Sequence, residues 1–168
     1  MRCTTVPEEM VDQAIEKIQQ VAQSYHRLVI IAAPSGSGKT AVLRELSTRL
    51  GFPWINVNLE VSRGFMNLTA RQRAMQLPAV LGDVVANSPG EVILLDNIEI
   101  LFDPALQQDP LRHFQGISRN RTVVVAWPGA TRRDDRGQVS LTYAVPGHPE
   151  YRRYPVADLV LVELSATP

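Results

Sequence analysis

The sequence predicts an α/β fold of three layers, with a five-stranded parallel sheet between two layers of helices. Short apolar runs rich in β-branched residues alternate along the chain with segments whose apolar residues recur at helical spacing. The runs contain few polar residues, which is typical of strands buried on both faces. Such alternation favours a parallel sheet covered on both sides. With 168 residues, 45% of them hydrophobic, we expect a single domain over residues 1–168.

The chain is expected to begin with a helix within residues 1–26. Its apolar residues recur at helical spacing: Met10, Val11, Ala14, Ile15, Ile18, Val21, Ala22 and Tyr25. Thr5 and Glu8 have the spacing of a capping box, and Pro7 is tolerated in the first turn of a helix. The apolar run at residues 28–32 then predicts the first buried strand.

The middle of the chain predicts two further helices and a second strand. A helix is expected over residues 38–50, directly after a glycine-rich segment. Alternating polar and apolar residues predict a strand over residues 54–59, with Trp54 in the core. The next helix is expected over residues 69–86, bent or restarted at Pro78.

Three more strands complete the predicted sheet. Asp103-Pro104 and Asp109-Pro110 each place an N-cap residue before a proline at the first helical position, so a helix is expected to begin there. The strands are expected at residues 92–95, 122–126 and 158–162.

An insertion is expected between the last two strands, over residues 128–157. This stretch has no helical pattern, and it is longer than an ordinary connection. Apolar and polar residues alternate over residues 139–145, which predicts one strand of a β-hairpin. The hairpin is expected to turn at residues 146–149 and to return through residues 151–154.

A phosphate-binding loop is indicated between the first strand and the helix that follows it. Residues 33–40 match the phosphate-loop pattern, except that alanine replaces its first glycine. Gly36 and Gly38 permit a backbone that aims several N–H groups at an anion, at a helix N-terminus. Lys39 would reach the β- and γ-phosphates of ATP, and Thr40 would hold Mg²⁺. The expected nucleotide-binding residues are Pro34, Ser35, Gly36, Ser37, Gly38, Lys39, Thr40 and Ala41.

An aspartate follows the third expected strand, where it would orient Mg²⁺. The chain between Lys39 and this residue, Asp96, is long enough to supply an intervening strand. That spacing favours the sheet order 5-1-4-3-2, with strands numbered along the chain, as in the ASCE group of ATPases, which includes RecA-like and AAA+ proteins. Kinases of small molecules usually place the acidic strand beside the loop strand, so the spacing disfavours them.

Two candidates for water activation follow Asp96. Many of these ATPases have a glutamate at the next position, but this chain has Asn97, which can hold a water molecule and cannot accept its proton. Glu99 can serve if the chain turns back after the strand, and its alternative is a solvated charge. The expected catalytic residues are Lys39, Asp96, Asn97 and Glu99, with Thr40 and Asp96 as the metal-binding residues.

Arginines gather in the expected insertion: Arg132, Arg133, Arg136, Arg152 and Arg153. All but Arg136 are candidates for an arginine finger, which in AAA+-type assemblies reaches the γ-phosphate of a neighbouring subunit. One alternative is a solvated loop that keeps the protein soluble. The other is contact between the hairpin and the DNA backbone, with Tyr143, Tyr151 and Tyr154 interleaved among the arginines.

Composition and charge argue against several classes of protein. The formal net charge is zero, which is unlike a strongly basic nucleic-acid-binding protein. One cysteine cannot form an intrachain disulfide, and neither a membrane-spanning run nor a secretory leader is recognisable. We therefore expect a cytoplasmic protein without membrane contact. The last expected strand lies near the end of the sequence, so we expect no C-terminal lid and a site completed by another subunit.

Four segments of the sequence together resemble one known family. They are the phosphate loop at residues 33–40, the Leu-Leu-Asp-Asn-Ile-Glu segment at 94–99, and the stretches 109–122 and 147–154. Together they resemble BrxF, the small phosphate-loop protein of type 3 BREX (bacteriophage exclusion) systems. The resemblance covers nearly the whole chain and implies a subunit of a bacterial defence complex that acts against phage DNA. The Asp-Asn-x-Glu arrangement belongs to the same pattern, which favours an active site.

Three functions are open at this point. The leading prediction is an ATP-binding and ATP-hydrolysing subunit of a BREX-like defence complex, partnered by other subunits of that complex or by copies of itself. The second is a nucleotide-gated protein or DNA interaction module without significant hydrolysis, because Asn97 replaces the usual glutamate. The third, a small-molecule kinase, is disfavoured by the spacing of the motifs.

Overall fold

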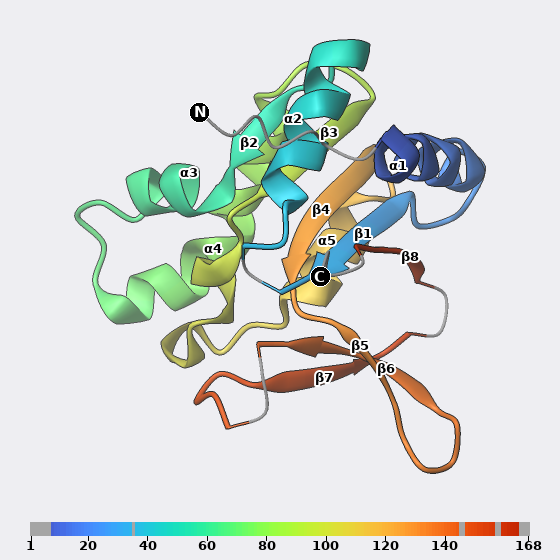
Figure 1. Cartoon of the computed structure of the whole chain (residues 1–168). Coiled ribbons are helices and arrows are strands. Elements are labelled where there is room, and N and C mark those ends of the chain that lie inside the picture. Colours follow the sequence, from blue (N-terminus) through green and yellow to red (C-terminus); the bar gives the residue numbers. More distant parts are fainter. Residues whose placement is uncertain (1–7, 35, 145–146, 157–158, 165–168) are drawn as a thin grey trace, which may run out of the picture.

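The main sheet of the computed structural model contains five parallel strands, and the structure describes residues 8–34, 36–144, 147–156 and 159–164. The strands are β1 (Leu28–Ala33), β2 (Trp54–Asn56), β3 (Val92–Asp96), β4 (Thr122–Pro128) and β8 (Val160–Glu163). Their order across the sheet is β2-β3-β4-β1-β8 (Figure 1). This is the predicted order, in which one strand separates the loop strand from the acidic strand.

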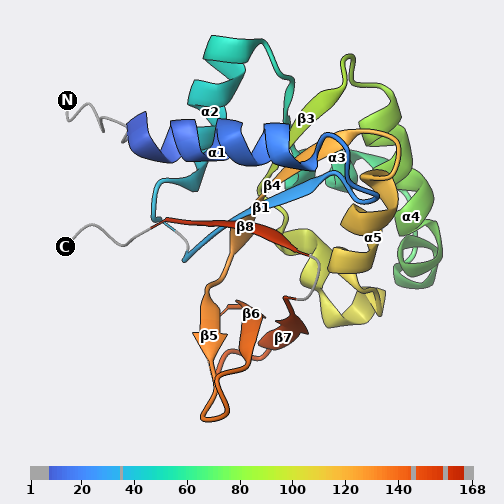
Figure 2. The same cartoon turned by 90° about the vertical axis from the view of Figure 1, so that its right-hand side faces the viewer.

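Helices cover both faces of this sheet (Figure 2). One face packs against α1 (Glu8–Val21) and α2 (Lys39–Leu50). The other face packs against α3 (Val57–Gly64), α4 (Ala70–Ala86) and α5 (Pro110–Ile117). Alternate residues of β1 take part in the two cores, with Ile31 on the α1–α2 side and Ile30 on the other, as expected for a strand buried on both faces.

The local signals for helix ends are confirmed where the structure describes them. Thr69 forms a capping box with Gln72 at the start of α4, which runs through Pro78 to Ala86. Asp103 and Asp109 accept backbone hydrogen bonds at the starts of a 3₁₀ helix, η2 (Pro104–Leu106), and of α5. The proposed Thr5 cap of the first helix lies outside the described residues.

The second strand is shorter than predicted. It ends at Asn56, and residues 57–59 begin α3 instead of continuing the strand. The reason is local, because the Asn56 side chain accepts a hydrogen bond from the backbone N–H of Leu59 and so caps the new helix. This early start of a helix changes the position of Asn58, which the functional site depends on.

A small antiparallel sheet lies at the carboxyl ends of β1 and β4 (Figures 1 and 2). It consists of β5 (Thr131–Arg133), β6 (Val139–Tyr143) and β7 (Arg152–Pro155), in that order. The pairing of β6 with β7 is the predicted hairpin, and β5 is an additional strand. Residues 145 and 146, in the predicted turn, lie outside the described residues.

An aromatic cluster joins the small sheet to the main domain. Tyr143 stacks on Phe102 with ring centroids 3.6 Å apart and ring planes 3° from parallel. Trp127 packs edge-on against Phe102 and against Tyr154. Because Tyr143 and Tyr154 are 5% and 8% exposed, neither ring is accessible for stacking on nucleic-acid bases, and the DNA-contact hypothesis is wrong for these two tyrosines.

Candidate functional site

The glycine-rich loop joins β1 to α2 at the carboxyl edge of the sheet. Gly36 and Gly38 both adopt left-handed backbone angles, with φ of 80° and 92°, which only glycine adopts readily. Gly38 stands at the N-cap of α2 and has no side chain to occupy the first N–H groups of the helix. Those groups are therefore available to an anion. Ser35, another predicted loop residue, lies outside the described residues.

Lys39 is buried at the base of this loop. Its Nζ atom donates hydrogen bonds to the backbone carbonyl oxygens of Ala33, at 2.5 Å, and Pro34, at 2.8 Å. Burial lowers the pKa of Lys39 below its ordinary value, and the nearby carboxylates of Glu99 and Asp96 oppose that shift. The ammonium group, the loop and both predicted acidic residues thus belong to one electrostatic site.

Asp96 ends β3 and is only 3% exposed. Its Oδ1 atom accepts a hydrogen bond from the backbone N–H of Asn97 at 2.9 Å, and its Oδ2 atom accepts one from Trp54 Nε1 at 3.2 Å. Trp54 is partly buried and packs against the core on the α1–α2 side, so the core prediction is confirmed in part, and its indole N–H also donates to the acidic residue. The Trp54 ring also takes part in a cation–π interaction, with the Arg44 guanidinium carbon 5.2 Å from the ring centroid.

Glu99 is turned back toward the loop by the residues after β3. Asn97 adopts a left-handed conformation with φ of 53°, which asparagine tolerates better than most residues. A 3₁₀ helix, η1 (Glu99–Phe102), follows at once. The predicted turn that would let Glu99 serve is therefore present, and Glu99 lies close enough to Lys39 to affect its pKa.

Asn58 holds Glu99 in place, and no pattern in the sequence indicates this role. The Asn58 Nδ2 atom donates to Glu99 Oε2 at 3.0 Å, and the Asn58 Oδ1 atom accepts from the backbone N–H of Ile100 at 2.8 Å. The backbone N–H of Asn58 donates to the carbonyl oxygen of Asn97 at 2.8 Å. A strand over residues 54–59 would not predict these contacts, because they require the helix to begin at Val57.

A cavity of about 740 Å³ opens beside the loop. Pro34 and Glu99 line it on the side of the main sheet, and Arg132, Thr142 and Tyr143 line it on the side of the small sheet. Burial, reinforced by Glu150 and Glu99, raises the pKa of Tyr143 to about 12, so its hydroxyl stays protonated at physiological pH. The cavity lies next to the phosphate-binding loop and is within the size range of small-ligand sites.

The four arginine-finger candidates occupy different environments. Arg152 donates to the carbonyl oxygens of Gln108, at 2.8 Å, and Phe102, at 3.3 Å, within its own chain. Those bonds fasten β7 to the main domain, so Arg152 does not project toward a neighbour. Arg132, Arg133 and Arg153 are exposed. Among these three, Arg132 lines the cavity beside the loop.

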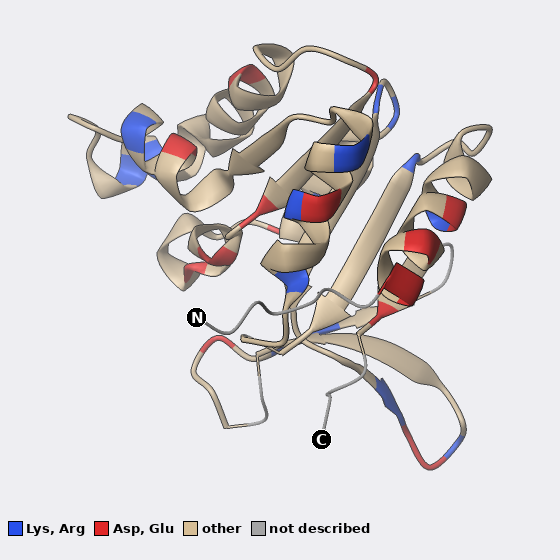
Figure 3. Cartoon of the chain, turned by 45° about the horizontal axis from the view of Figure 1, so that its top comes forward, with Lys and Arg blue, Asp and Glu red and all other residues tan. Residues whose placement is uncertain are grey.

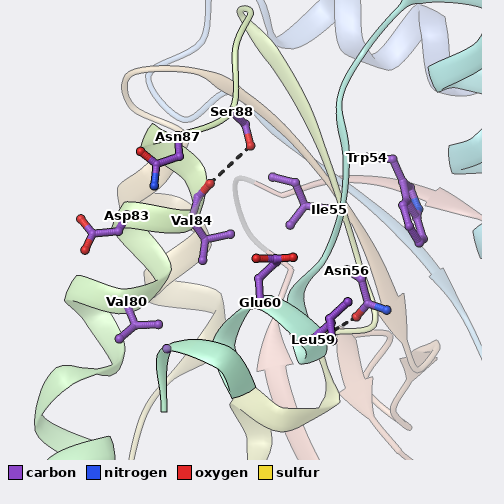
Figure 4. Close-up of a pocket in the computed structure, with 11 residues that line it drawn as sticks. Trp54, Ile55, Asn56, Leu59, Glu60, Val80, Asp83, Val84, Asn87 and Ser88 are labelled. Atoms are coloured by element: carbon purple, nitrogen blue, oxygen red, sulfur yellow. Dashed lines mark hydrogen bonds between the residues drawn. The ribbon is translucent and has the colours of Figure 1, made fainter. Parts of the chain in front are cut away.

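A second cavity, of about 580 Å³, lies between β2, α3 and α4 (Figure 4). Trp54, Glu60 and Asp83 are among the residues that line it. Trp54 thus contacts both this cavity and Asp96, to which its indole N–H donates. Charged residues of both signs are spread over the helices of the molecule (Figure 3).

The arrangement is that of a P-loop NTPase of the additional-strand type. A buried lysine at a glycine-rich loop, a buried aspartate on another strand, and an intervening strand between the two define this class. The model of the family described as "ATPase family associated with various cellular activities (AAA)" matches residues 29–131, so the chain belongs to the AAA family of ATPases.

A solved structure shares features of this fold. The crystal structure of a DNA replication initiation factor is similar with a TM-score of 0.48 and 14% sequence identity, over 96% of this chain and 48% of that chain. This chain therefore spans about half the length of that protein. No curated protein matched the sequence. Within the described residues, no helix combines the length and apolar character required to cross a bilayer.

Proposed function

We propose that this chain binds Mg·ATP at residues 34–41 and hydrolyses it. The observation that carries the proposal is the convergence of Lys39, Asp96 and Glu99 at the carboxyl edge of the sheet, where both carboxylates act on the buried ammonium group. In this proposal the left-handed glycines shape the loop around the phosphates, and Lys39 exchanges its loop carbonyl partners for phosphate oxygens.

The Thr40 hydroxyl and the Asp96 carboxylate are oxygen donors of the kind that Mg²⁺ prefers, so this part of the site fits the ion. Both Asp96 oxygens already accept one hydrogen bond each, and a carboxylate has lone pairs left for a metal-bound water molecule. When bound, Mg²⁺ would neutralise phosphate charge.

Glu99 is the proposed general base, and Asn58 is its positioning residue. The oxygen of a water molecule attacks the γ-phosphorus, the bond from γ-phosphorus to the β–γ bridging oxygen breaks, and Glu99 accepts the water proton. The Asn58 side chain orients the Glu99 carboxylate, because it bonds both that carboxylate and the following backbone. The Asn97 side chain is proposed to hold the water molecule.

Alanine substitutions of the two lysines in the sequence test nucleotide binding and hydrolysis, with Lys39 as the site residue and Lys17 as the control. Lys39→Ala should lose ATP affinity in calorimetric titration and release no phosphate from Mg·ATP. Lys17→Ala should match the wild type in both measurements, because the Lys17 ammonium lies on the exposed face of α1 and bonds to Gln20. Unchanged ATP affinity in Lys39→Ala would refute the assignment of the loop.

A second candidate function is a nucleotide-gated interaction module without significant turnover. It is favoured by the replacement of the usual glutamate by Asn97 directly after Asp96. ATP binding without phosphate release above the Lys39→Ala blank would support it. Turnover that is lost in both Asp96→Ala and Glu99→Ala would instead support hydrolysis.

We further propose that the chain works within a bacterial anti-phage complex of the BREX type. The support is the similarity of the loop, the Asp-Asn-x-Glu segment and the 109–122 and 147–154 stretches to BrxF. The proposed partners are other subunits of that complex or further copies of this chain. We also propose phosphate-backbone contact between the small sheet and DNA, through the exposed Arg133 and Arg153. Phage plating on cells that carry the complete system, with and without Lys39→Ala, tests the defence role.

A further inference from the structure

Arg132 lies on the face of the small sheet that is turned away from the aromatic core. In the pairing of β5 with β6, Arg132 stands opposite Ser140, and Thr131 stands opposite Leu141. Neighbouring residues of a strand point to opposite faces. Leu141 is fully buried in the core, so Arg132 points to the other face. There it lines the cavity that also contacts Pro34 of the phosphate loop and Glu99.

The small sheet is a fixed platform for this arginine. The Thr131 hydroxyl, one residue before Arg132, donates to a Glu163 carboxylate oxygen on β8. The Thr142 carbonyl oxygen accepts a hydrogen bond from Trp127 Nε1 at 2.9 Å, and the Thr142 hydroxyl donates to the carbonyl oxygen of Ala130 at 3.0 Å. The edge strand β5 and the central strand β6 of the small sheet are thus both bonded to the sheet that carries the loop.

The lack of a bonding partner also distinguishes Arg132 from the neighbouring arginines. Arg133 donates to the Gly137 carbonyl oxygen, Arg153 donates to the Ser140 hydroxyl, and Arg152 is engaged with the main domain. Within the described part of the chain, the Arg132 guanidinium has no hydrogen-bond or ion-pair partner. Its planar fork is therefore available for an oxyanion in the cavity.

We propose that Arg132 binds the γ-phosphate held by the loop of its own chain, so that one subunit contains a complete site. This inference rests on the proposed function, because it assumes that ATP occupies the loop. Lys39 would then approach the phosphates from the loop side and Arg132 from the side of the small sheet. An arginine supplied within the same chain avoids the need for a neighbouring subunit to deliver one.

The first experiment mixes two defective variants. Arg132→Ala should lower the rate of phosphate release by about 10³-fold or more, while its ADP affinity stays close to that of the wild type. An equimolar mixture with Lys39→Ala should stay at the Arg132→Ala level, because no subunit then contains both residues. Recovery of activity in the mixture would mean that Arg132 acts across a subunit contact, and would overturn the proposal. Arg136→Ala, at the tip of the small sheet, is the matched control.

The second experiment requires no turnover. Aluminium fluoride with Mg·ADP mimics the transferring phosphoryl group, and its binding is measured at a concentration where light scattering shows a monomer. We expect aluminium fluoride to tighten ADP binding in the wild type and in Arg136→Ala, and to have no such effect in Arg132→Ala. Equal tightening in Arg132→Ala would refute the role of Arg132. Failure of the wild type to bind ADP at all would instead refute the proposed function.

Discussion

Asn58 and Glu99 are joined by a hydrogen bond of 3.0 Å from the amide Nδ2 to the carboxylate Oε2. The amide oxygen of the same asparagine accepts the backbone N–H of Ile100 at 2.8 Å. One side chain therefore fixes both the carboxylate and the backbone that carries it. This pair links the first turn of α3 to η1, so the position of α3 sets the position of Glu99.

We expect Asn58→Ala to reduce kcat by about 10²-fold, because a misplaced base costs roughly that much in rate. KM and ATP affinity should change little, since Asn58 bonds Glu99 and none of the described residues of the phosphate-binding loop. Asn58→Asp should be at least as defective, because a carboxylate cannot donate to Glu99 and would repel it. Steady-state phosphate release measures the effect, with the exposed Asn120→Ala as control. A large rise in KM without a loss of kcat would contradict the positioning role.

The Trp54 indole is expected to stabilise the fold through Asp96. Trp54→Phe keeps an aromatic ring and removes the N–H that bonds Asp96 Oδ2. The buried carboxylate then lacks one partner, which costs about 1–3 kcal/mol. Urea unfolding should therefore show a lower free energy of unfolding for Trp54→Phe. The loss should shrink when Asp96→Asn is already present, and full additivity of the two changes would argue against the coupling.

The strand order was predictable because most of the strands are short apolar runs, and because the chain between Lys39 of the loop and Asp96 is long enough to supply an intervening strand. Asn58 and Trp54 were not predictable as site residues. Their contacts depend on the register that pairs Trp54 with Leu94, and on the start of α3 at Val57. A local pattern contains neither piece of information.

The small sheet was only partly predictable for a related reason. β6 alternates in polarity, and its pairing with β7 follows from that pattern. β5 is a three-residue strand of Thr131, Arg132 and Arg133, with no apolar residue to indicate it. The burial of Tyr143 also depends on a tertiary contact, its stacking on Phe102.

The titration of Lys39 should make the stability of the protein depend on pH in the alkaline range below 10.5. Burial lowers its pKa in the folded state, whereas the unfolded chain has the ordinary value of 10.5. As pH rises toward 10.5, the folded protein releases this proton first and the unfolded chain binds more protons. The free energy of unfolding therefore increases with pH in that window, so the folded state becomes more stable. Lys39→Met should lack the contribution, whereas Lys17→Met should keep it; parallel curves for the wild type and Lys39→Met would contradict this.

Gly129 is expected to be irreplaceable for the placement of the small sheet. A Cβ atom at this position would lie 1.7 Å from the carbonyl oxygen of Thr142, so Gly129→Ala must displace β6. Overpacking of this severity should lower the free energy of unfolding by about 3 kcal/mol or more. Gly82→Ala is the matched control, because a Cβ atom there meets nothing within 4 Å on the exposed side of α4. That change should stabilise the protein by about 0.5–1 kcal/mol, since alanine favours a helix.

Displacement of β6 should also affect activity, because β6 pairs with the strand that carries Arg132. In Gly129→Ala, at a temperature where circular dichroism shows a folded protein, phosphate release should fall toward the Arg132→Ala level while ADP affinity is retained. Gly82→Ala should keep the wild-type rate. A folded Gly129→Ala protein with full activity would show that the site does not depend on the position of the small sheet.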